Sequence, residues 1–289
     1  MSTALPPFTA HFASLASRYD VALCDVWGVV HNGVAAFPAA CDALMQFRAR
    51  GGSVVLITNS PRPSDSVARQ LERLQVPRGI YDGMVSSGDV TRSVILSRPG
   101  QSLFHLGPER DRSVFAGLDM RFAPLESADY VVCTGLENDE TETPGDYGAR
   151  LKAMRARNLF MVCGNPDVVV ERGDRLLYCA GALADIYAEM GGEVLYAGKP
   201  YPPIYGMAAA KAEGTRGAKV PPGRMLAIGD SLRTDLRGAR DFGVDFLFVT
   251  SGIHAEQFGA RENPDAQALR GVLGEAGKEL AAIMPRLVW

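Results

Sequence analysis

Short apolar runs alternate with amphipathic helical patterns along almost the whole chain, and this alternation constrains the fold more than any other feature of the sequence. Apolar runs of strand length stand at 21–24, 54–57, 103–106, 130–133, 160–163, 225–228 and 246–249. The spacing between them predicts helices at 39–50, 64–74, 112–116, 147–157, 204–213 and 232–242, with one or two more over 266–283. This order predicts an α/β fold with a parallel sheet that is covered on both faces.

Length, charge and cysteine usage narrow the class of protein. A chain of 289 residues predicts one large domain or two domains. The net charge of −3 gives no electrostatic reason to expect nucleic acid or an anionic membrane as a partner. No apolar run approaches the length of a membrane span, and the first residues do not resemble a signal peptide. The five scattered cysteines contain no CxxC, so we expect reduced thiols in a cytoplasmic protein rather than a zinc site or disulfide framework.

Polar residues that could act in catalysis or binding follow several of the predicted strands. In open α/β sheets, ligands bind beyond the carboxyl ends of the strands, so these residues are candidates for a site. They are Asp25 at the end of the first run, Thr58 and Asn59 after the second, Lys199 before the helix at 204–213, and Asp230 and Asp235 after the run at 225–228.

Together these residue types fit phosphoryl transfer. Asp25 is ionised at neutral pH and could act as a nucleophile without a base, but it must approach an anion. Magnesium held by Asp230 and Asp235 would remove that repulsion. Lys199 could neutralise charge, and Thr58 with backbone N–H groups could hold phosphate oxygens. Each residue alone has a plainer interpretation as a turn, a helix cap or a solvated side chain.

The order of four segments resembles the haloacid dehalogenase superfamily, in its branch of NagD-like and p-nitrophenyl phosphatases. The segments are DVWGV at 25–29 for DxDGV, ITNS at 57–60 for the Ser or Thr motif, GKP at 198–200 for the lysine motif, and GDSLRTD at 229–235 for GDxxxxD. The resemblance covers nearly the whole chain, since GNPD at 164–167 looks like a signature of the inserted cap of this branch.

The resemblance implies a fold and a set of roles. It implies a Rossmann-like core from residues 1–94 and 194–289, with a smaller inserted α/β cap over 95–193, and it admits a homodimer. It implies a magnesium-dependent hydrolase that acts on a small phosphorylated substrate through an aspartyl-phosphate. The implied roles are Asp25 as nucleophile and metal ligand, the Trp27 carbonyl and Asp230 as further ligands, Asp235 as support for the metal site, Thr58 and Lys199 as catalytic groups, Asn59 as a phosphate or substrate contact, and Asn165, Asp167, Glu171 and Arg172 as cap contacts to substrate.

Trp27 departs from the family pattern, because phosphatases of the family have a general acid–base aspartate at this position. Indole is no acid near neutral pH. The enzyme could act on phosphates with good leaving groups, or another group such as His31 could supply the proton. Alternatively, the chain could bind a phosphorylated metabolite with little turnover. Dehalogenase-like hydrolysis of a carbon–halogen bond stays open as a lesser alternative.

Overall fold

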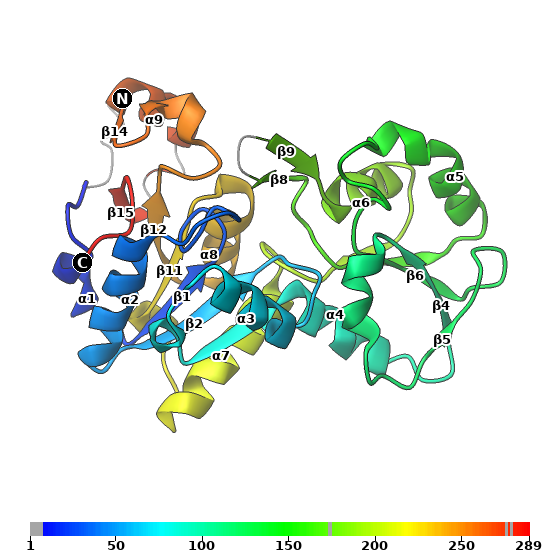
Figure 1. Ribbon diagram of the computed structural model, residues 1–289, viewed down its shortest axis with the longest axis horizontal. Coiled ribbons are helices and arrows are strands. Elements are labelled where there is room, and N and C mark those ends of the chain that lie inside the picture. Colours follow the sequence, from blue (N-terminus) through cyan, green and yellow to red (C-terminus); the bar gives the residue numbers. More distant parts are fainter. Residues whose placement is uncertain (1–7, 173–174, 275–276, 278–279) are drawn as a thin grey trace. The chain divides into compact units, whose positions relative to one another are not determined.

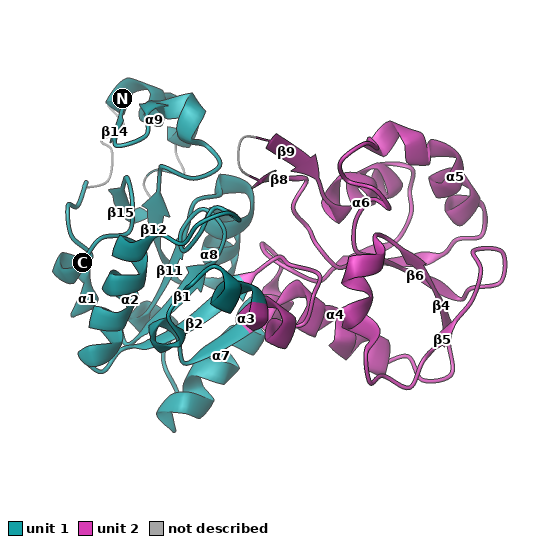
Figure 2. Cartoon of the chain, viewed as in Figure 1, with its two compact units in different colours: residues 1–57, 70–84, 205–289 teal, residues 58–69, 85–204 magenta. Residues whose placement is uncertain are grey.

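The computed structural model describes residues 8–172, 175–274, 277 and 280–289, and it divides into two compact units (Figures 1 and 2). Unit 1 contains Met1–Ile57, Gln70–Met84 and Tyr205–Trp289, and unit 2 contains Thr58–Arg69 and Val85–Ile204. Unit 2 therefore extends beyond residues 95–193, and the assignment of that narrower range to an inserted cap stays a prediction.

Unit 1 is built on a six-stranded sheet in the order β15-β12-β11-β1-β2-β3. Its strands are β1 (Val21–Asp25), β2 (Ser53–Thr58), β3 (Gly83–Ser86), β11 (Met225–Gly229), β12 (Asp245–Val249) and β15 (Leu280–Met284). β1 pairs in parallel with both β2 and β11, and every residue of these three strands is buried. Burial on both faces explains why their sequences are continuous apolar runs rather than alternating ones.

Unit 2 has a sheet of its own, in the order β10-β7-β6-β4-β5. Its strands are β4 (Ser102–Leu106), β5 (Arg121–Phe122), β6 (Tyr130–Cys133), β7 (Phe160–Cys163) and β10 (Val194–Tyr196). All four pairings are parallel. The α/β class with a Rossmann-like parallel core, predicted from the alternation and the resemblance, is confirmed.

Helices and short ribbons complete the chain. The α-helices are α1 (Ala13–Ala16), α2 (Pro38–Ala49), α3 (Ser64–Arg73), α4 (Ser87–Leu96), α5 (Gly148–Ala156), α6 (Ala180–Glu189), α7 (Pro202–Arg216), α8 (Arg237–Phe242) and α9 (Ala266–Leu273). Two hairpin-like ribbons are β8 (Val169–Arg172) with β9 (Arg175–Tyr178), and β13 (Gly259–Ala260) with β14 (Asn263–Pro264). Among the described residues, no helix is both long enough and apolar enough to cross a membrane.

Local chemistry explains several helix boundaries. Pro38 begins α2, where a missing N–H costs nothing. At the start of α4, the Ser86 side chain accepts from Asp89 N–H while the Asp89 carboxylate accepts from Ser86 N–H, so two end groups are satisfied reciprocally. Gly243 ends α8 in the left-handed conformation that glycine adopts without strain.

The sequence prediction was wrong in part of the C-terminal segment. Residues 266–283 were expected to be helical, but the helix ends at Leu273 and Leu280–Met284 forms β15. β15 pairs in parallel with β12, so Phe248 stands beside Ile283. The run LAAIM contains good helix formers, but pairing at the sheet edge and burial of its apolar side chains override that propensity.

Candidate active site

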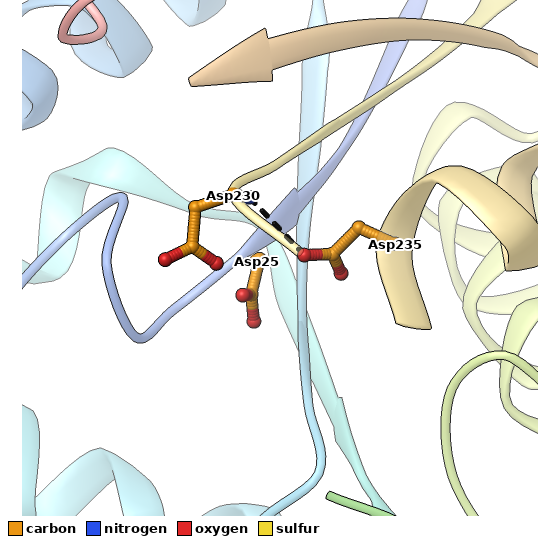
Figure 3. Close-up of side chains that lie close together, drawn as sticks. All are labelled: Asp25, Asp230 and Asp235. Atoms are coloured by element: carbon orange, nitrogen blue, oxygen red, sulfur yellow. Dashed lines mark hydrogen bonds between the residues drawn. The ribbon is translucent and has the colours of Figure 1, made fainter. Parts of the chain in front are cut away.

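Three carboxylates of unit 1 converge at the carboxyl ends of β1 and β11 (Figure 3). Asp25 is the last residue of β1, Asp230 directly follows β11, and Asp235 lies in the next helical turn, η5 (Leu232–Leu236). Oxygen atoms of the three lie within 4.8 Å of one another, and the three residues are only 8%, 6% and 3% exposed.

Sheet topology explains why the three meet. The chain adds β2 and β3 on one side of β1 and later returns to add β11, β12 and β15 on the other side. The strand order reverses between β1 and β11, and ligands of open α/β sheets bind at that switch point. The predicted placement of Asp25 and Asp230 at one sheet edge is what the structure shows.

Backbone N–H groups fix the orientation of each carboxylate. Val26 N–H donates to Asp25 Oδ1 at 2.7 Å, and Ile253 N–H donates to Asp230 Oδ2 at 2.8 Å. Asp235 Oδ2 accepts from the N–H groups of both Asp230 and Ser231, at 3.2 and 3.1 Å (Figure 3). Asp235 therefore holds the backbone of the loop that carries Asp230, and its supporting role in a metal site stays a prediction.

Two glycines permit the close approach of backbone to Asp230. A Cβ on Gly28 would lie 1.9 Å from Asp230 Oδ2, and Gly28 also has a φ of +76°. A Cβ on Gly252 would lie 1.8 Å from the same oxygen. Any side chain at either position would displace the carboxylate, so the sequence needs glycine at both.

The donor set fits magnesium. Buried carboxylates at this separation repel one another unless protons or a cation balance their charge. Magnesium prefers hard oxygen ligands and often takes one or two carboxylates. Asp25, Asp230 and Asp235 are the residues that would hold it, and one oxygen of each also accepts from backbone N–H groups. The Trp27 carbonyl as a further ligand stays a prediction.

The Trp27 indole packs on its own loop. Its ring lies 4.9 Å from the His31 ring at an interplanar angle of 70°, and a Cβ on Gly33 would lie 2.5 Å from Trp27 Cη2. The main chain of the loop closes on itself, because Gly28 N–H donates to the His31 carbonyl at 2.8 Å. The indole thus has a packing role within residues 27–33 of unit 1.

His31 is poorly suited to the role of replacement acid. It is 1% exposed, and its Nδ1 accepts from Gly33 N–H at 2.8 Å. Burial lowers the pKa of His31 to about 4, so the imidazole is neutral near pH 7 with its proton on Nε2. That Nε2 has no hydrogen-bond partner within the described part of the chain. The structure therefore argues against His31 as a proton donor.

Asn59 of unit 2 has a role that differs from the expected one. Its Nδ2 donates to Asp167 Oδ1 at 3.0 Å and to the Lys199 carbonyl at 3.1 Å. Its Oδ1 accepts from Lys199 N–H at 2.7 Å and from Ser87 Oγ at 3.5 Å. Both amide hydrogens and the oxygen are committed, so the expectation that Asn59 contacts substrate is not supported. Asn59 instead positions the backbone of Lys199, and no signal in the sequence indicates this.

Other residues that we expected to contact substrate form hydrogen bonds or ion pairs within the protein. The Asn165 side chain accepts from Asp167 N–H at 3.1 Å, which is the tight turn that its residue type favours. Arg172 forms ion pairs at 3.6 Å with Asp139 and with Glu140. The Glu171 side chain lies outside the described part of the chain.

Thr58, a predicted catalytic residue, ends β2, where its Oγ1 accepts from Ser60 N–H at 3.2 Å. The predicted residues thus form two sets, one in each unit.

Family models match both ends of the chain. The model described as haloacid dehalogenase-like hydrolase matches residues 22–121, and the one described as HAD-hydrolase-like matches 196–272. A crystal structure of a hydrolase of the haloacid dehalogenase-like family from Brucella suis 1330 is 45% identical, with a TM-score of 0.86. The match covers 98% of this chain and 100% of that one. The chain belongs to the haloacid dehalogenase-like hydrolase family.

Several relatives are phosphatases. The 5'-nucleotidase YutF of Bacillus subtilis is 25% identical over 81% of this chain and 88% of its own length. The D-glycerol 3-phosphate phosphatase of Mycobacterium tuberculosis is 28% identical over 84% of this chain and 66% of its own length. The 4-nitrophenylphosphatase of Thermotoga maritima is 25% identical, with a TM-score of 0.65 over 87% of this chain and 94% of that one. The chain is thus a phosphatase-like hydrolase of this family.

We predict that Asn59→Ala lowers the free energy of unfolding by about 2–3 kcal/mol, because it leaves the buried N–H and C=O groups of Lys199 unsatisfied. Asn59→Asp keeps the acceptor but removes both donors and places a second carboxylate beside Asp167, so its loss should be at least as large. Chemical denaturation measures both. The exposed Asn263→Ala is the control, and an equal effect in the control would contradict the positioning role.

Proposed function

We propose that this protein is a magnesium-dependent phosphatase that hydrolyses small phosphorylated metabolites through an aspartyl-phosphate on Asp25. The convergence of Asp25, Asp230 and Asp235 at the switch point of the unit 1 sheet carries the proposal. The named activities of the relatives, on nucleotides and on glycerol phosphate, support the class of substrate.

Asp25 supplies the nucleophile. The pKa of an ordinary aspartate lies near 4, so a carboxylate in this place attacks phosphorus without a base. Val26 N–H holds Oδ1 and thereby fixes the plane of the carboxylate. Attack forms the bond from a carboxylate oxygen to phosphorus and breaks the bond from phosphorus to the leaving oxygen. Water then attacks phosphorus, and the bond from phosphorus to the Asp25 oxygen breaks. Inorganic phosphate and the free carboxylate are released, and the proton lost by the water passes to solvent.

The other residues of the proposed mechanism have separate tasks. A bound magnesium ion would offset the negative charge that the carboxylates and the phosphoryl group bring together. Asp235 orders the backbone of Asp230 and Ser231, which keeps Asp230 in place for that ion. The buried Lys199, whose backbone Asn59 clamps, is the proposed cation for phosphate oxygens, and Thr58 is the proposed hydroxyl donor.

Trp27 determines which substrates react well. General acid–base help is typically worth ~10²–10⁴ in rate, and neither the indole nor the neutral His31 supplies it. The leaving groups of aryl, acyl and anhydride phosphates depart without protonation. These phosphates are therefore the favoured substrates. The same loss favours a second candidate, a phosphometabolite-binding or regulatory protein with slow turnover. Dehalogenase-like chemistry does not require the metal site that the carboxylates form, so we do not favour it.

Two further expectations remain predictions. The scattered cysteines, all five of which are buried, are the reason to expect a cytoplasmic protein. The resemblance admits a homodimer, which sedimentation of the purified chain would test.

We predict magnesium-dependent release of phosphate from p-nitrophenyl phosphate, abolished in Asp25→Asn. Loss of the negative charge removes both the nucleophile and a proposed metal ligand. Chelation by EDTA should also abolish release, and added magnesium should restore it. The matched control is Asp119→Asn, an exposed aspartate of unit 2 that should keep full activity. Residual activity in Asp25→Asn close to that of the native protein would contradict the mechanism.

We predict that Trp27→Asp raises the rate on alkyl phosphates by ~10²-fold or more, since it restores an acid two residues after the nucleophile. The rate on p-nitrophenyl phosphate should change much less, because that leaving group needs no proton. Trp27→Phe is the control, because it keeps an aromatic ring over Gly33 and adds no acid. If alkyl phosphates gain nothing from Trp27→Asp, proton supply is not the limiting factor.

A further inference from the structure

The loop after β11 carries both Asp230 and Asp235, and side chains satisfy several of its backbone N–H groups (Figure 3). The Asp235 carboxylate accepts from the N–H groups of Asp230 and Ser231. The Ser231 hydroxyl accepts from Thr234 N–H at 3.3 Å. The first N–H groups of a helical turn have no partner within the turn, so each needs an acceptor from elsewhere. The N–H of Leu232, the first residue of η5, is one of these groups.

His254 supplies that acceptor from a different part of unit 1. Its Nε2 accepts from Leu232 N–H at 3.3 Å, although 22 residues separate the two in the chain. His254 lies in the segment that follows β12, and β12 is the parallel neighbour of β11. The carboxyl ends of the two strands lie at the same edge of the sheet, and this explains why the two segments meet.

The same segment also holds the Asp230 side chain. Ile253 N–H donates to Asp230 Oδ2 at 2.8 Å, and a Cβ on Gly252 would lie 1.8 Å from that oxygen. The loop is thus held at two points, one on the carboxylate of Asp230 and one on the backbone of Leu232. A single hydrogen bond would leave the loop free to pivot about it, and the second removes that freedom.

Packing holds the imidazole in place. His254 is partly buried and directly precedes η6 (Ala255–Phe258). Its ring centroid lies 6.4 Å from that of Phe258, which is 1% exposed, at an interplanar angle of 55°. Ser251 Oγ donates to the Arg261 carbonyl at 2.7 Å, so the segment before His254 is anchored to the chain beyond η6.

His254 must present an unprotonated Nε2 to accept this bond. A neutral imidazole has one acceptor nitrogen and one N–H, whereas an imidazolium has two N–H groups and no acceptor. Burial lowers the pKa of His254, although the Gln257 side chain and the Asp235 carboxylate act in the opposite direction. The imidazole is therefore neutral near pH 7, with its proton on Nδ1 and the lone pair of Nε2 directed at Leu232 N–H.

We propose that His254 is a positioning residue for the magnesium site, because its bond to Leu232 keeps Asp230 and Asp235 at the separation at which they bind the ion. The proposal rests on the proposed function, and it assigns to His254 an action through the loop rather than on the substrate. Residues that orient metal ligands typically change metal affinity by ~10–100-fold when they are removed. None of the four sequence motifs includes position 254.

The test measures the dissociation constant for magnesium of the full chain by calorimetry. His254→Phe keeps a ring beside Phe258 and removes the acceptor, whereas His254→Gln keeps an acceptor oxygen. We expect His254→Phe to raise the dissociation constant about 10-fold, and His254→Gln to stay within about 3-fold of the native protein.

Tyr19→Phe is the matched control. It also removes one side-chain hydrogen bond without loss of the ring, but its partner is Asp245, at the amino end of β12 and thus at the opposite edge of the sheet. This variant should lower the melting temperature and leave the dissociation constant for magnesium unchanged.

Hydrogen exchange of the Leu232 amide, measured by NMR without metal, reports on the bond itself. We expect exchange at this amide to be about 5-fold faster or more in His254→Phe, and close to native in His254→Gln and Tyr19→Phe.

The outcomes separate the alternatives. Faster exchange at Leu232 together with weaker magnesium binding in His254→Phe supports the proposal. An unchanged exchange rate, or an unchanged dissociation constant, overturns it. Equal weakening of magnesium binding in Tyr19→Phe also overturns it, because the effect would then follow from a general loss of stability. If the native protein binds no magnesium, the proposed function fails and the magnesium part of this proposal fails with it. Exchange at Leu232 then decides whether His254 holds the loop.

Discussion

Repulsion among Asp25, Asp230 and Asp235 is the constraint around which unit 1 is organised. At an effective dielectric constant of about 20, two charges about 4.8 Å apart repel by about 3 kcal/mol. Three such pairs would cost on the order of 10 kcal/mol, which is comparable to the whole stability of a typical domain. A fold that buries these groups needs a compensating cation or protons. The backbone N–H groups that hold each carboxylate lower the cost but do not balance the charge.

Each unit contains a parallel sheet whose strand order reverses between two neighbouring strands. In open α/β sheets, ligands bind outside the carboxyl ends of the strands at such a reversal. In unit 1 three acidic groups converge at this point, and they are suited to a metal and to attack on phosphorus. In unit 2 the hydroxyl of Thr134, which follows β6, lies 2.8 Å from His105 Nε2 and hydrogen-bonds to Asp111. Glycine at positions 28 and 107 permits the close backbone approach in each case.

The strands with continuous apolar runs are predicted well from the sequence, because a strand that is buried on both faces consists mostly of apolar residues. The strands at 130–133 and 160–163 are found with the predicted bounds, and the carboxylates of unit 1 follow from strand ends alone. β15 was predicted as helix, because pairing with a distant strand is not visible in local composition. The role of Asn59 was missed for the same reason, since two of its partners, Asp167 and Lys199, lie more than a hundred residues away in the chain.

Trapping of the phosphorylated enzyme tests the central claim most directly. With Trp27 in place of an aspartate, neither the formation nor the hydrolysis of the aspartyl-phosphate has a general acid–base group. A good leaving group needs no acid, so with such a substrate only the hydrolysis step is slowed. The aspartyl-phosphate should therefore accumulate after mixing with p-nitrophenyl phosphate and magnesium. Acid quenching and borohydride reduction convert an acyl phosphate to homoserine, which peptide mass spectrometry locates. We predict homoserine at position 25 and at no other aspartate. Release of phosphate with no modification of Asp25, or with modification elsewhere, would contradict the account.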